Sequence, residues 1–413
     1  MVWVVSSGDE LLEGRIVDTN AAYLASQIAD RGLTCGQIQA VGDDEQSLVE
    51  CWERARLAGA AGVVMTGGLG DTRDDLTRAA MAHFFKVPLM PHGEALSMME
   101  QFYLKLGREL PEAEPTEAIL PAGAVALHNP SGVAPGVVCA DDGFLVLAMP
   151  GVPHELKGMV EFGALDHLPR TVESVSVGRI CHVGIPERRL GGAYRDYLTR
   201  GRNPLVAIAP KRGHVELCVR ATHPTAEGAA ALLAQDMEAL ALIEPESIIS
   251  LRGEAPSQRV GRELMERGLT LSVAESLTGG LIGHQLTELA GISGVLLGDC
   301  VVYSNAAKVG MLGVAQGDLD SYGAVSEAVA CAMAEGIRRL TQSDLAVSTT
   351  GIAGPGGGSR EKPVGLVWAA VADANGTVAE RRILPGNRSE VKDRAAAFAL
   401  DLLRRACSWG QGG

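Results

Sequence analysis

The sequence predicts an α/β protein with an α/β domain at each end and a small α+β module between them. Short valine-rich strand segments alternate with amphipathic helical segments over residues 1–90 and again over residues 258–405. The chain also combines 51 glycines with only 4% aromatic residues, as folds with many tight strand-to-helix turns do. Its 413 residues are too many for one ordinary core, so more than one domain is expected.

The N-terminal domain, expected over residues 1–168, should be a doubly wound parallel sheet, because its strand and helix signals follow one another in βαβ order. A proline-containing turn at residues 150–153 leads from its last strand into a helix that begins at His154. The expected strands are Val2–Ser6, Cys35–Val41, Gly62–Thr66 and Phe144–Met149, and the expected helices are Thr19–Arg31, Gln46–Leu57 and Leu76–Phe85.

The pattern changes over residues 169–252, which we interpret as the small α+β module, and a linker at residues 250–256 leads into a C-terminal α/β domain, residues 253–413. The module is expected to hold strands near Arg179–Val183, Val206–Ala209 and Val215–Ala221 and helices near Glu187–Thr199 and Ala226–Leu242. The C-terminal domain is expected to hold helix Gln258–Arg267, strands Leu269–Ala274, Val295–Tyr303 and Leu345–Thr349, and a final helix Ser389–Arg405.

The bulk properties narrow the class of function. A net charge of −14 argues against a nucleic-acid-binding surface, since phosphate neutralisation needs clustered lysines and arginines. No apolar run reaches the roughly 18 residues that span a bilayer, and residues 1–5 are expected to be a strand and not a signal peptide. The eight cysteines are scattered without paired spacing, as in a protein kept reduced. We therefore expect a soluble, cytoplasmic enzyme without membrane contact.

Three polar clusters in the C-terminal domain carry the candidate chemistry. Ser276 lies where a strand ends and two glycines open a helix, so it can serve as a nucleophile, although Ser276 and Thr278 could equally be helix caps. Lys308 follows the next strand and can deprotonate a serine if burial lowers its pKa, although an isolated lysine is more often a surface residue. Tyr303 and Asn305 beside it can donate hydrogen bonds to an amide or an oxyanion, or cap the turn.

The third cluster is a loop at residues 351–358 with five glycines and one proline. Backbone of this kind can approach an anion closely, so the loop is a candidate phosphate cradle. It is no Walker A loop, because no Gly-Lys-Ser/Thr ends it, and a purely structural turn is the alternative.

Glycines and carboxylates also follow three strands of the N-terminal domain, in segments 8–14, 42–44 and 66–75. The carboxyl ends of such strands are where a parallel sheet binds ligands. Glycines beside carboxylates suit a phosphate held near a divalent cation, while the alternative is that these aspartates cap helices and form turns.

The C-terminal motifs, segments 274–280, 303–308, 322–326 and 350–365 in that order, strongly resemble the CinA C-terminal domain, the nicotinamide mononucleotide deamidase family. The resemblance implies hydrolysis of nicotinamide mononucleotide to nicotinate mononucleotide and ammonia without a cofactor, and it suggests a homodimer. It also implies Ser276 as nucleophile, Lys308 as its base and Tyr303 as a supporting catalytic residue. The implied substrate-binding residues are Glu275, Thr278, Gly279, Asn305, Thr350, Gly351, Gly354, Gly356, Gly357 and Arg388.

The N-terminal motifs, extended by segments 129–136 and 150–157, resemble the molybdopterin-binding-like domain at the front of full-length CinA proteins. This resemblance implies an ADP-ribose pyrophosphatase that uses a divalent metal such as Mg, Mn or Co. The implied metal ligands are Asp44, Asp74 and Asp75, and the implied phosphate contacts are Gly67, Gly68 and Gly70.

The chain departs from these family patterns at several positions. Leu277 stands where cysteine is common, and Asn387 replaces an aspartate before Arg388, which removes the charge of the usual partner of that arginine. Asp71 replaces a proline, segment 115–121 lacks a basic residue, and segment 184–188 matches only loosely. Two alternatives therefore stay open: an N-terminal domain that binds a pterin or nucleotide without hydrolysis, and a non-enzymatic adaptor in DNA uptake or repair.

Overall fold

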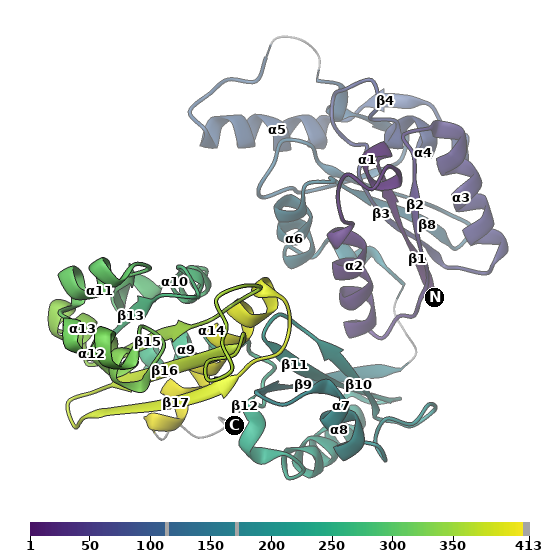
Figure 1. Cartoon of the computed structure of the whole chain (residues 1–413). Coiled ribbons are helices and arrows are strands. Elements are labelled where there is room, and N and C mark those ends of the chain that lie inside the picture. Colours follow the sequence, from purple (N-terminus) through teal and green to yellow (C-terminus); the bar gives the residue numbers. More distant parts are fainter. Residues whose placement is uncertain (112–114, 170–172, 408–413) are drawn as a thin grey trace. The chain divides into compact units, whose positions relative to one another are not determined.

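The structure, a computed structural model, describes residues 1–111, 115–169 and 173–407. It divides into two compact units (Figure 1). Unit 1 comprises Met1–Val175 with His223–Thr225, and unit 2 comprises Ser176–Thr222 with Ala226–Gly413. Unit 2 therefore contains both the four-stranded sheet of the middle module and the five-stranded sheet of the C-terminal domain.

Unit 1 is built on a six-stranded sheet in the order β2-β1-β3-β8-β7-β6. The first four strands in this order run parallel, and β7 and β6 continue the sheet antiparallel at one edge. Strands β1 and β8 are buried at every position, as expected of a parallel sheet covered on both faces. The strands are β1 Val2–Ser7, β2 Cys35–Val41, β3 Gly62–Thr66, β6 Val125–Leu127, β7 Gly136–Asp141 and β8 Phe144–Met149.

Helices cover both faces of this sheet, because alternate strand residues enter two separate cores. One core contains Trp52 and Met81, and the other contains Leu24 and Leu156. The expected doubly wound domain is thus confirmed. Its helices are α1 Asp9–Leu12, α2 Thr19–Asp30, α3 Glu45–Leu57, α4 Thr77–Phe85, α5 Gly93–Lys105 and α6 Pro153–Glu161, and a small separate ladder joins β4 Leu89–Pro91 to β5 Ile119–Pro121.

The middle module is a four-stranded sheet in the order β10-β11-β9-β12, in which β10 pairs antiparallel with β11 and β9 with β12. Helices α7 and α8 accompany it. The helix expected over Glu187–Thr199 ends at Ala193, so that expectation is wrong at its C-terminal half. Two consecutive glycines, Gly191 and Gly192, weaken the helix, and Tyr194 turns into the core of the module. The elements are β9 Ser174–Val183, α7 Glu187–Ala193, β10 Leu205–Pro210, β11 His214–His223, α8 Ala226–Ala241 and β12 Ile248–Ser250.

The C-terminal sheet has the order β14-β13-β15-β16-β17, with β14, β13 and β15 parallel and β16 and β17 antiparallel. Helices α9, α10 and α14 pack on one face and α11, α12 and α13 on the other. The strands are β13 Leu271–Glu275, β14 Leu296–Val301, β15 Leu345–Gly351, β16 Leu366–Ala372 and β17 Thr377–Ile383. The helices are α9 Pro256–Arg267, α10 Leu281–Thr287, α11 Asn305–Leu312, α12 Gln316–Tyr322, α13 Glu327–Thr341 and α14 Arg388–Ala406.

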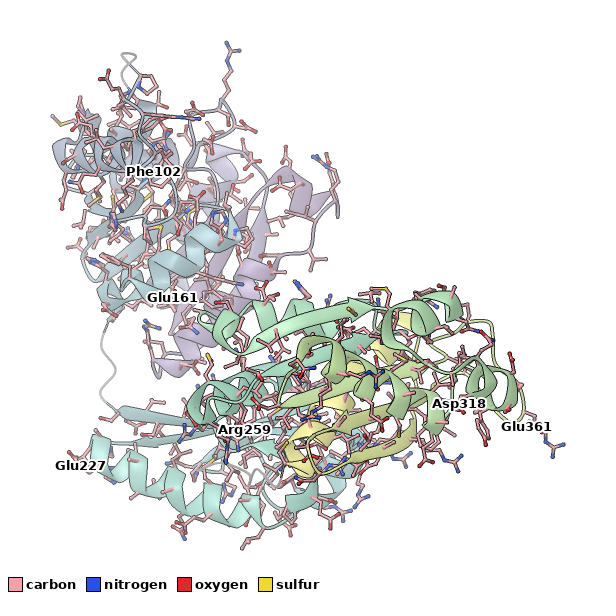
Figure 2. The ribbon with its side chains drawn as sticks, turned by 90° about the vertical axis from the view of Figure 1, so that its left-hand side faces the viewer. Phe102, Glu161, Glu227, Arg259, Asp318 and Glu361 are labelled. Carbon is pink, nitrogen blue, oxygen red and sulfur yellow. The ribbon has the colours of Figure 1, made fainter. Side chains whose placement is uncertain are left out.

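Charged side chains of unit 2 divide between surface and interior. Figure 2 shows Glu227 and Glu361 at the outside of the unit, whereas Arg259 of α9 is 1% exposed. Arg259 forms an ion pair with Glu263 one turn later, which explains how a guanidinium is accommodated there. Among the described residues, no helix is both long and apolar enough to cross a bilayer.

Candidate active site

Ser276 follows β13, the middle one of the three parallel strands of the C-terminal sheet. Strand β13 lies between β14 and β15, and all three run parallel, so their carboxyl ends meet at one edge of the sheet. Ser276 comes directly after β13, Tyr303 follows β14, and Thr350 is the next-to-last residue of β15. The parallel topology thus gathers the three polar clusters that the sequence separates.

Lys308 lies on α11 with its ammonium beside Ser276. Nζ is 3.1 Å from Ser276 Oγ, and it donates to the carbonyl oxygens of Val302 at 2.8 Å and Tyr303 at 3.2 Å. The side chain is 1% exposed, and this burial lowers the pKa of Lys308 below its ordinary value. The side chain is therefore no solvated surface lysine; it is a fixed basic group within hydrogen-bond distance of a hydroxyl.

Glu275, the residue before Ser276, is fully buried and faces α10. Its two carboxylate oxygens accept from the backbone N–H groups of Gly280 and Gly283, each at 2.9 Å. These bonds fix the turn that carries Ser276 to the first turn of the helix. The role of Glu275 in substrate binding stays a prediction, while its contacts fix the backbone of the turn.

Asp299 on β14 was not singled out by the sequence and lies beside Glu275. Burial, followed by the charge of Glu275, raises the pKa of Asp299 to about 7. A Cβ on Gly283 would lie 2.1 Å from Asp299 Oδ2, so only glycine leaves room for this carboxyl group. The one available signal was a single acidic residue within the apolar segment 295–302.

The turn after Ser276 offers backbone donors. The amide of Ser276 donates to Thr349 O at 3.0 Å, and the amide of Gly280 is taken by Glu275. Within the described part of the chain, the amides of residues 277–279 donate to no protein acceptor. Backbone N–H groups at this position are suited to bind a developing oxyanion, so these three amides are the candidate oxyanion donors.

Arg388, the first residue of α14, joins two of the predicted clusters. Its guanidinium donates to Gly354 O at 2.9 Å and to Tyr303 Oη at 3.0 Å. Tyr303 is 62% exposed, so this contact holds an otherwise solvated ring beside the glycine-rich loop. The missing charge at Asn387 has a local explanation, because the Asn387 side chain accepts from Glu390 N and caps α14.

The other predicted binding residues divide into three groups. Thr278 is buried, and its hydroxyl hydrogen-bonds the side chain of Thr349 at Oγ1, 2.7 Å away. Thr350 Oγ1 donates to the backbone at Ala324 O at 2.7 Å, so both hydroxyls have partners within the protein. Gly279 lies in the Ser276 turn with φ +63°. Asn305 is exposed at the start of α11, and the glycine-rich loop residues Gly351, Gly354, Gly356 and Gly357 follow or end β15.

In unit 1, a cavity of about 620 Å³ lies at the carboxyl ends of the parallel strands. The predicted phosphate contacts Gly67, Gly68 and Gly70 line it. Gly67 and Gly68 have φ +107° and +67°, and a Cβ on Gly67 would lie 2.4 Å from Ser7 O. A side chain at position 67 is therefore excluded, and the bare backbone of this turn lines the cavity.

The predicted metal ligands Asp44, Asp74 and Asp75 are not gathered into one site. Asp44 caps α3 by accepting from Ser47 N at 2.8 Å and lies outside the cavity, while Asp75 accepts from the amides of Gly70 and Thr72. Over the described ranges, no three His, Cys, Asp or Glu residues are placed to hold a metal ion. Asp74 and Asp75 line the cavity whereas Asp44 does not, so the structure does not bring the three predicted ligands together, and the divalent metal stays a prediction. Asp44 and Asp75 make the cap and turn contacts of the alternative.

Comparisons with known proteins cover nearly the whole chain. A family model described as the CinA C-terminal domain matches residues 254–407, and one described as a probable molybdopterin binding domain matches residues 3–170. A competence-damage inducible protein of Clostridioides difficile is 36% identical over 97% of this chain and 98% of its own length. A CinA-like protein of Kosmotoga olearia is 35% identical over 98% of each chain. A solved structure of the competence/damage inducible protein CihA from Agrobacterium tumefaciens is 43% identical, covers 36% of this chain and 92% of its own, and has a TM-score of 0.36.

Proposed function

This chain belongs to the CinA family, and from that premise we propose that its C-terminal domain hydrolyses the carboxamide of nicotinamide mononucleotide to nicotinate mononucleotide and ammonia. The observation that carries the proposal is the buried Lys308 Nζ, 3.1 Å from Ser276 Oγ. A serine with an adjacent base is one of the arrangements that covalent amide hydrolysis uses.

The first half of the proposed reaction forms an ester. Neutral Lys308 accepts the hydroxyl proton of Ser276, and Oγ attacks the carboxamide carbon. The amides of residues 277–279 donate to the oxyanion of the tetrahedral intermediate. The Lys308 ammonium then gives its proton to the leaving nitrogen, the C–N bond breaks, and ammonia departs.

The second half releases the acid. A water molecule loses a proton to neutral Lys308 and attacks the ester carbon, and the C–Oγ bond then breaks as Ser276 regains a proton. Together the two halves convert one amide and one water to one carboxylic acid and one ammonia. Every proton transfer uses the same lysine, so the scheme needs no second acid or base.

The binding of the mononucleotide phosphate is proposed for the loop at residues 351–358. The Arg388 guanidinium lies against this loop through Gly354 O and also holds Tyr303. A fixed guanidinium beside glycine backbone is suited to an anion.

The experiment that tests the proposal is ammonia release from nicotinamide mononucleotide by the full chain in the presence of EDTA. Ser276→Ala and Lys308→Ala should each lose at least about a thousandfold in kcat. Lys105→Ala, a change at an exposed lysine in unit 1, should retain the wild-type rate. If Ser276→Ala keeps most of the wild-type turnover, the mechanism is wrong. Salt-dependent DNA binding together with no ammonia release would favour the adaptor hypothesis instead.

For the N-terminal domain we propose nucleotide binding without hydrolysis. Two observations favour this alternative over the pyrophosphatase: the glycine turn at residues 67–70 lines a cavity, and the described carboxylates form no three-ligand group. Titration calorimetry with ADP-ribose and Mg²⁺, Mn²⁺ or Co²⁺ should detect binding. Release of AMP in the same mixtures at a rate proportional to protein concentration would restore the pyrophosphatase.

A further inference from the structure

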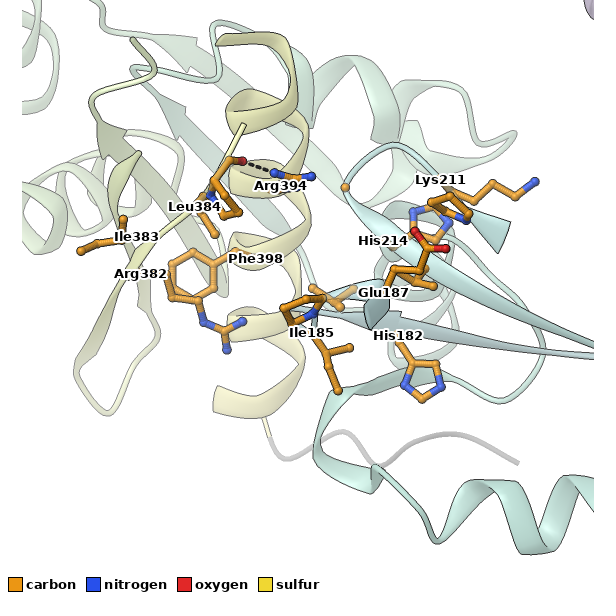
Figure 3. A pocket seen from close by; sticks show the side chains of 17 residues that line it. His182, Ile185, Glu187, Lys211, His214, Arg382, Ile383, Leu384, Arg394 and Phe398 are labelled. Atoms are coloured by element: carbon orange, nitrogen blue, oxygen red, sulfur yellow. Dashed lines mark hydrogen bonds between the residues drawn. The ribbon is translucent and has the colours of Figure 1, made fainter. Parts of the chain in front are cut away.

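A second cavity, of about 470 Å³, lies within unit 2 between the middle module and the C-terminal domain (Figure 3). The module contributes residues 182–187 and, from the hairpin, Pro210, Lys211 and residues 213–215. The C-terminal domain contributes residues 382–385, Arg394 and Phe398. None of the proposed catalytic residues lines it, so it is separate from the Ser276 site.

The two walls of this cavity are packed against each other at its edges. A Cβ on Gly213, at the tip of the β10–β11 hairpin, would lie 2.5 Å from Asp393 O of α14. Cys181, Val183 and Ile249 of the module and Ala397 of α14 form one small buried cluster, and Val183 also lines the cavity. These contacts fix the distance between the walls, so the cavity belongs to the packed unit.

The charge of the cavity is opposite to that of the chain. The described residues that line it include three cations, Lys211, Arg382 and Arg394, and one carboxylate, Glu187, whereas the whole chain carries −14. Burial lowers the pKa of His214 below its ordinary value and that of His182 to about 4, so neither ring adds charge near pH 7.

Arg382 is placed to face a ligand. Its guanidinium lies 4.6 Å from the centre of the Phe398 ring, and Gly184 provides the space, since a Cβ there would lie 1.9 Å from Arg382 Nη1. A guanidinium stacked on an aromatic ring presents a flat surface with forked donors at its edge. Ile185 and Leu384 add apolar wall beside it (Figure 3).

We propose that this cavity binds a small organic phosphate of nucleoside monophosphate size. The volume lies within the range of about 300–1,000 Å³ typical of small-molecule sites. The three cations can form ion pairs with a phosphate group. The stacked guanidinium and the apolar wall can pack against a planar ring, and the Glu187 carboxylate can accept a hydrogen bond from a sugar hydroxyl. This site is independent of the amide-hydrolysing site and of the nucleotide cavity in unit 1.

The test is calorimetric titration of AMP into the full chain with EDTA present. We expect AMP binding that includes a site in this cavity, with the Kd of that site raised at least about tenfold in Lys211→Met and in Arg382→Met. Arg381→Met is the matched control: this exposed neighbour lies over Trp368 and does not line the cavity, so its Kd should stay within about twofold of wild type.

Two outcomes would overturn the proposal: no AMP binding by wild type at millimolar concentration, or an equal weakening in Arg381→Met. Arg382→Met also removes packing against Phe398, so its fold is checked by thermal unfolding. Lys211 is exposed, and Lys211→Met therefore keeps the test decisive if Arg382→Met unfolds. Unchanged affinity in Lys211→Met would also contradict the proposal.

Discussion

Lys308 determines the pH dependence of the proposed reaction at the scale of single residues. The lysine must be neutral to accept the Ser276 proton, and burial lowers its pKa below the ordinary 10.5. We expect kcat/KM for nicotinamide mononucleotide to rise with pH and to level off below pH 10.5. Lys308→Arg, which stays protonated, should lose at least about a thousandfold at every pH. A profile that is flat from pH 5.5 to 10 would contradict the role of Lys308 as base.

The Asp299 and Glu275 pair predicts a pH dependence of stability. The pKa of Asp299 is raised from 3.8 to about 7 in the folded chain, so the folded state binds this proton more tightly than the unfolded state. The resulting stabilisation is fully present below about pH 4 and is lost as pH rises through about 7. Asp299→Asn cannot ionise, so the fall of Tm between pH 5 and pH 8 should become shallower than in wild type.

Thermal unfolding at four pH values between 5 and 8 measures this difference. Asp320→Asn, at an exposed site on α12, serves as the control and should keep the wild-type slope. Parallel Tm profiles for wild type and Asp299→Asn would show that the carboxyl pair shares no proton in this range.

Helix α14 is the element that connects the glycine-rich loop to the fold, and its N-terminal cap can be tested directly. Asn387→Ala removes the side chain that accepts from Glu390 N and should cost about 0.5–2 kcal/mol of unfolding free energy. Asn387→Asp keeps the cap and adds a charge that suits a helix N-terminus, with a gain of about 0.3–1 kcal/mol. Urea denaturation measures the change in unfolding free energy of both variants. Ser389→Ala, two residues after the cap, is the control and should change stability by less than about 0.5 kcal/mol.

The same helix predicts coupling between Arg388 and Tyr303. Because Arg388 holds both Tyr303 Oη and Gly354 O, Arg388→Met and Tyr303→Phe should each raise KM for nicotinamide mononucleotide by about tenfold. The double variant should be little worse than the more damaging single change, since both remove one shared contact. Fully additive effects on KM would mean that the two residues act separately.

The junction inside unit 2 belongs to the scale of the whole molecule. Gly213 and Gly201 have nearly equal φ angles, +77° and +78°, so alanine at either position carries a similar backbone penalty. A Cβ on Gly213 would also meet Asp393 O, whereas a Cβ on Gly201 would meet nothing within 4 Å. We expect Gly213→Ala to lower the calorimetric Tm by several degrees more than Gly201→Ala. Equal shifts would mean that the hairpin tip does not pack on α14 in solution.

The sequence by itself determined the alternation of strands and helices, and with it the class of both α/β domains. It also singled out Ser276, Tyr303 and Lys308, because a serine after a strand and polar residues within apolar segments are visible in the chain. These are local signals: the periodicity of neighbouring residues sets which face of a strand or helix is apolar. Where local signals conflicted, as in the helix shortened at Ala193, the expected boundary was wrong.

Only the tertiary structure decided which of these residues meet. The packing of different elements places Lys308 3.1 Å from Ser276 and the Asp299 carboxyl beside Glu275. It also places Asp75 in the lining of the unit 1 cavity and leaves Asp44 outside that lining. The cavity between the middle module and α14 likewise depends on segments about 170 residues apart in the chain. Such contacts are fixed by how the sheets and helices pack, and burial then changes the pKa of the groups they enclose.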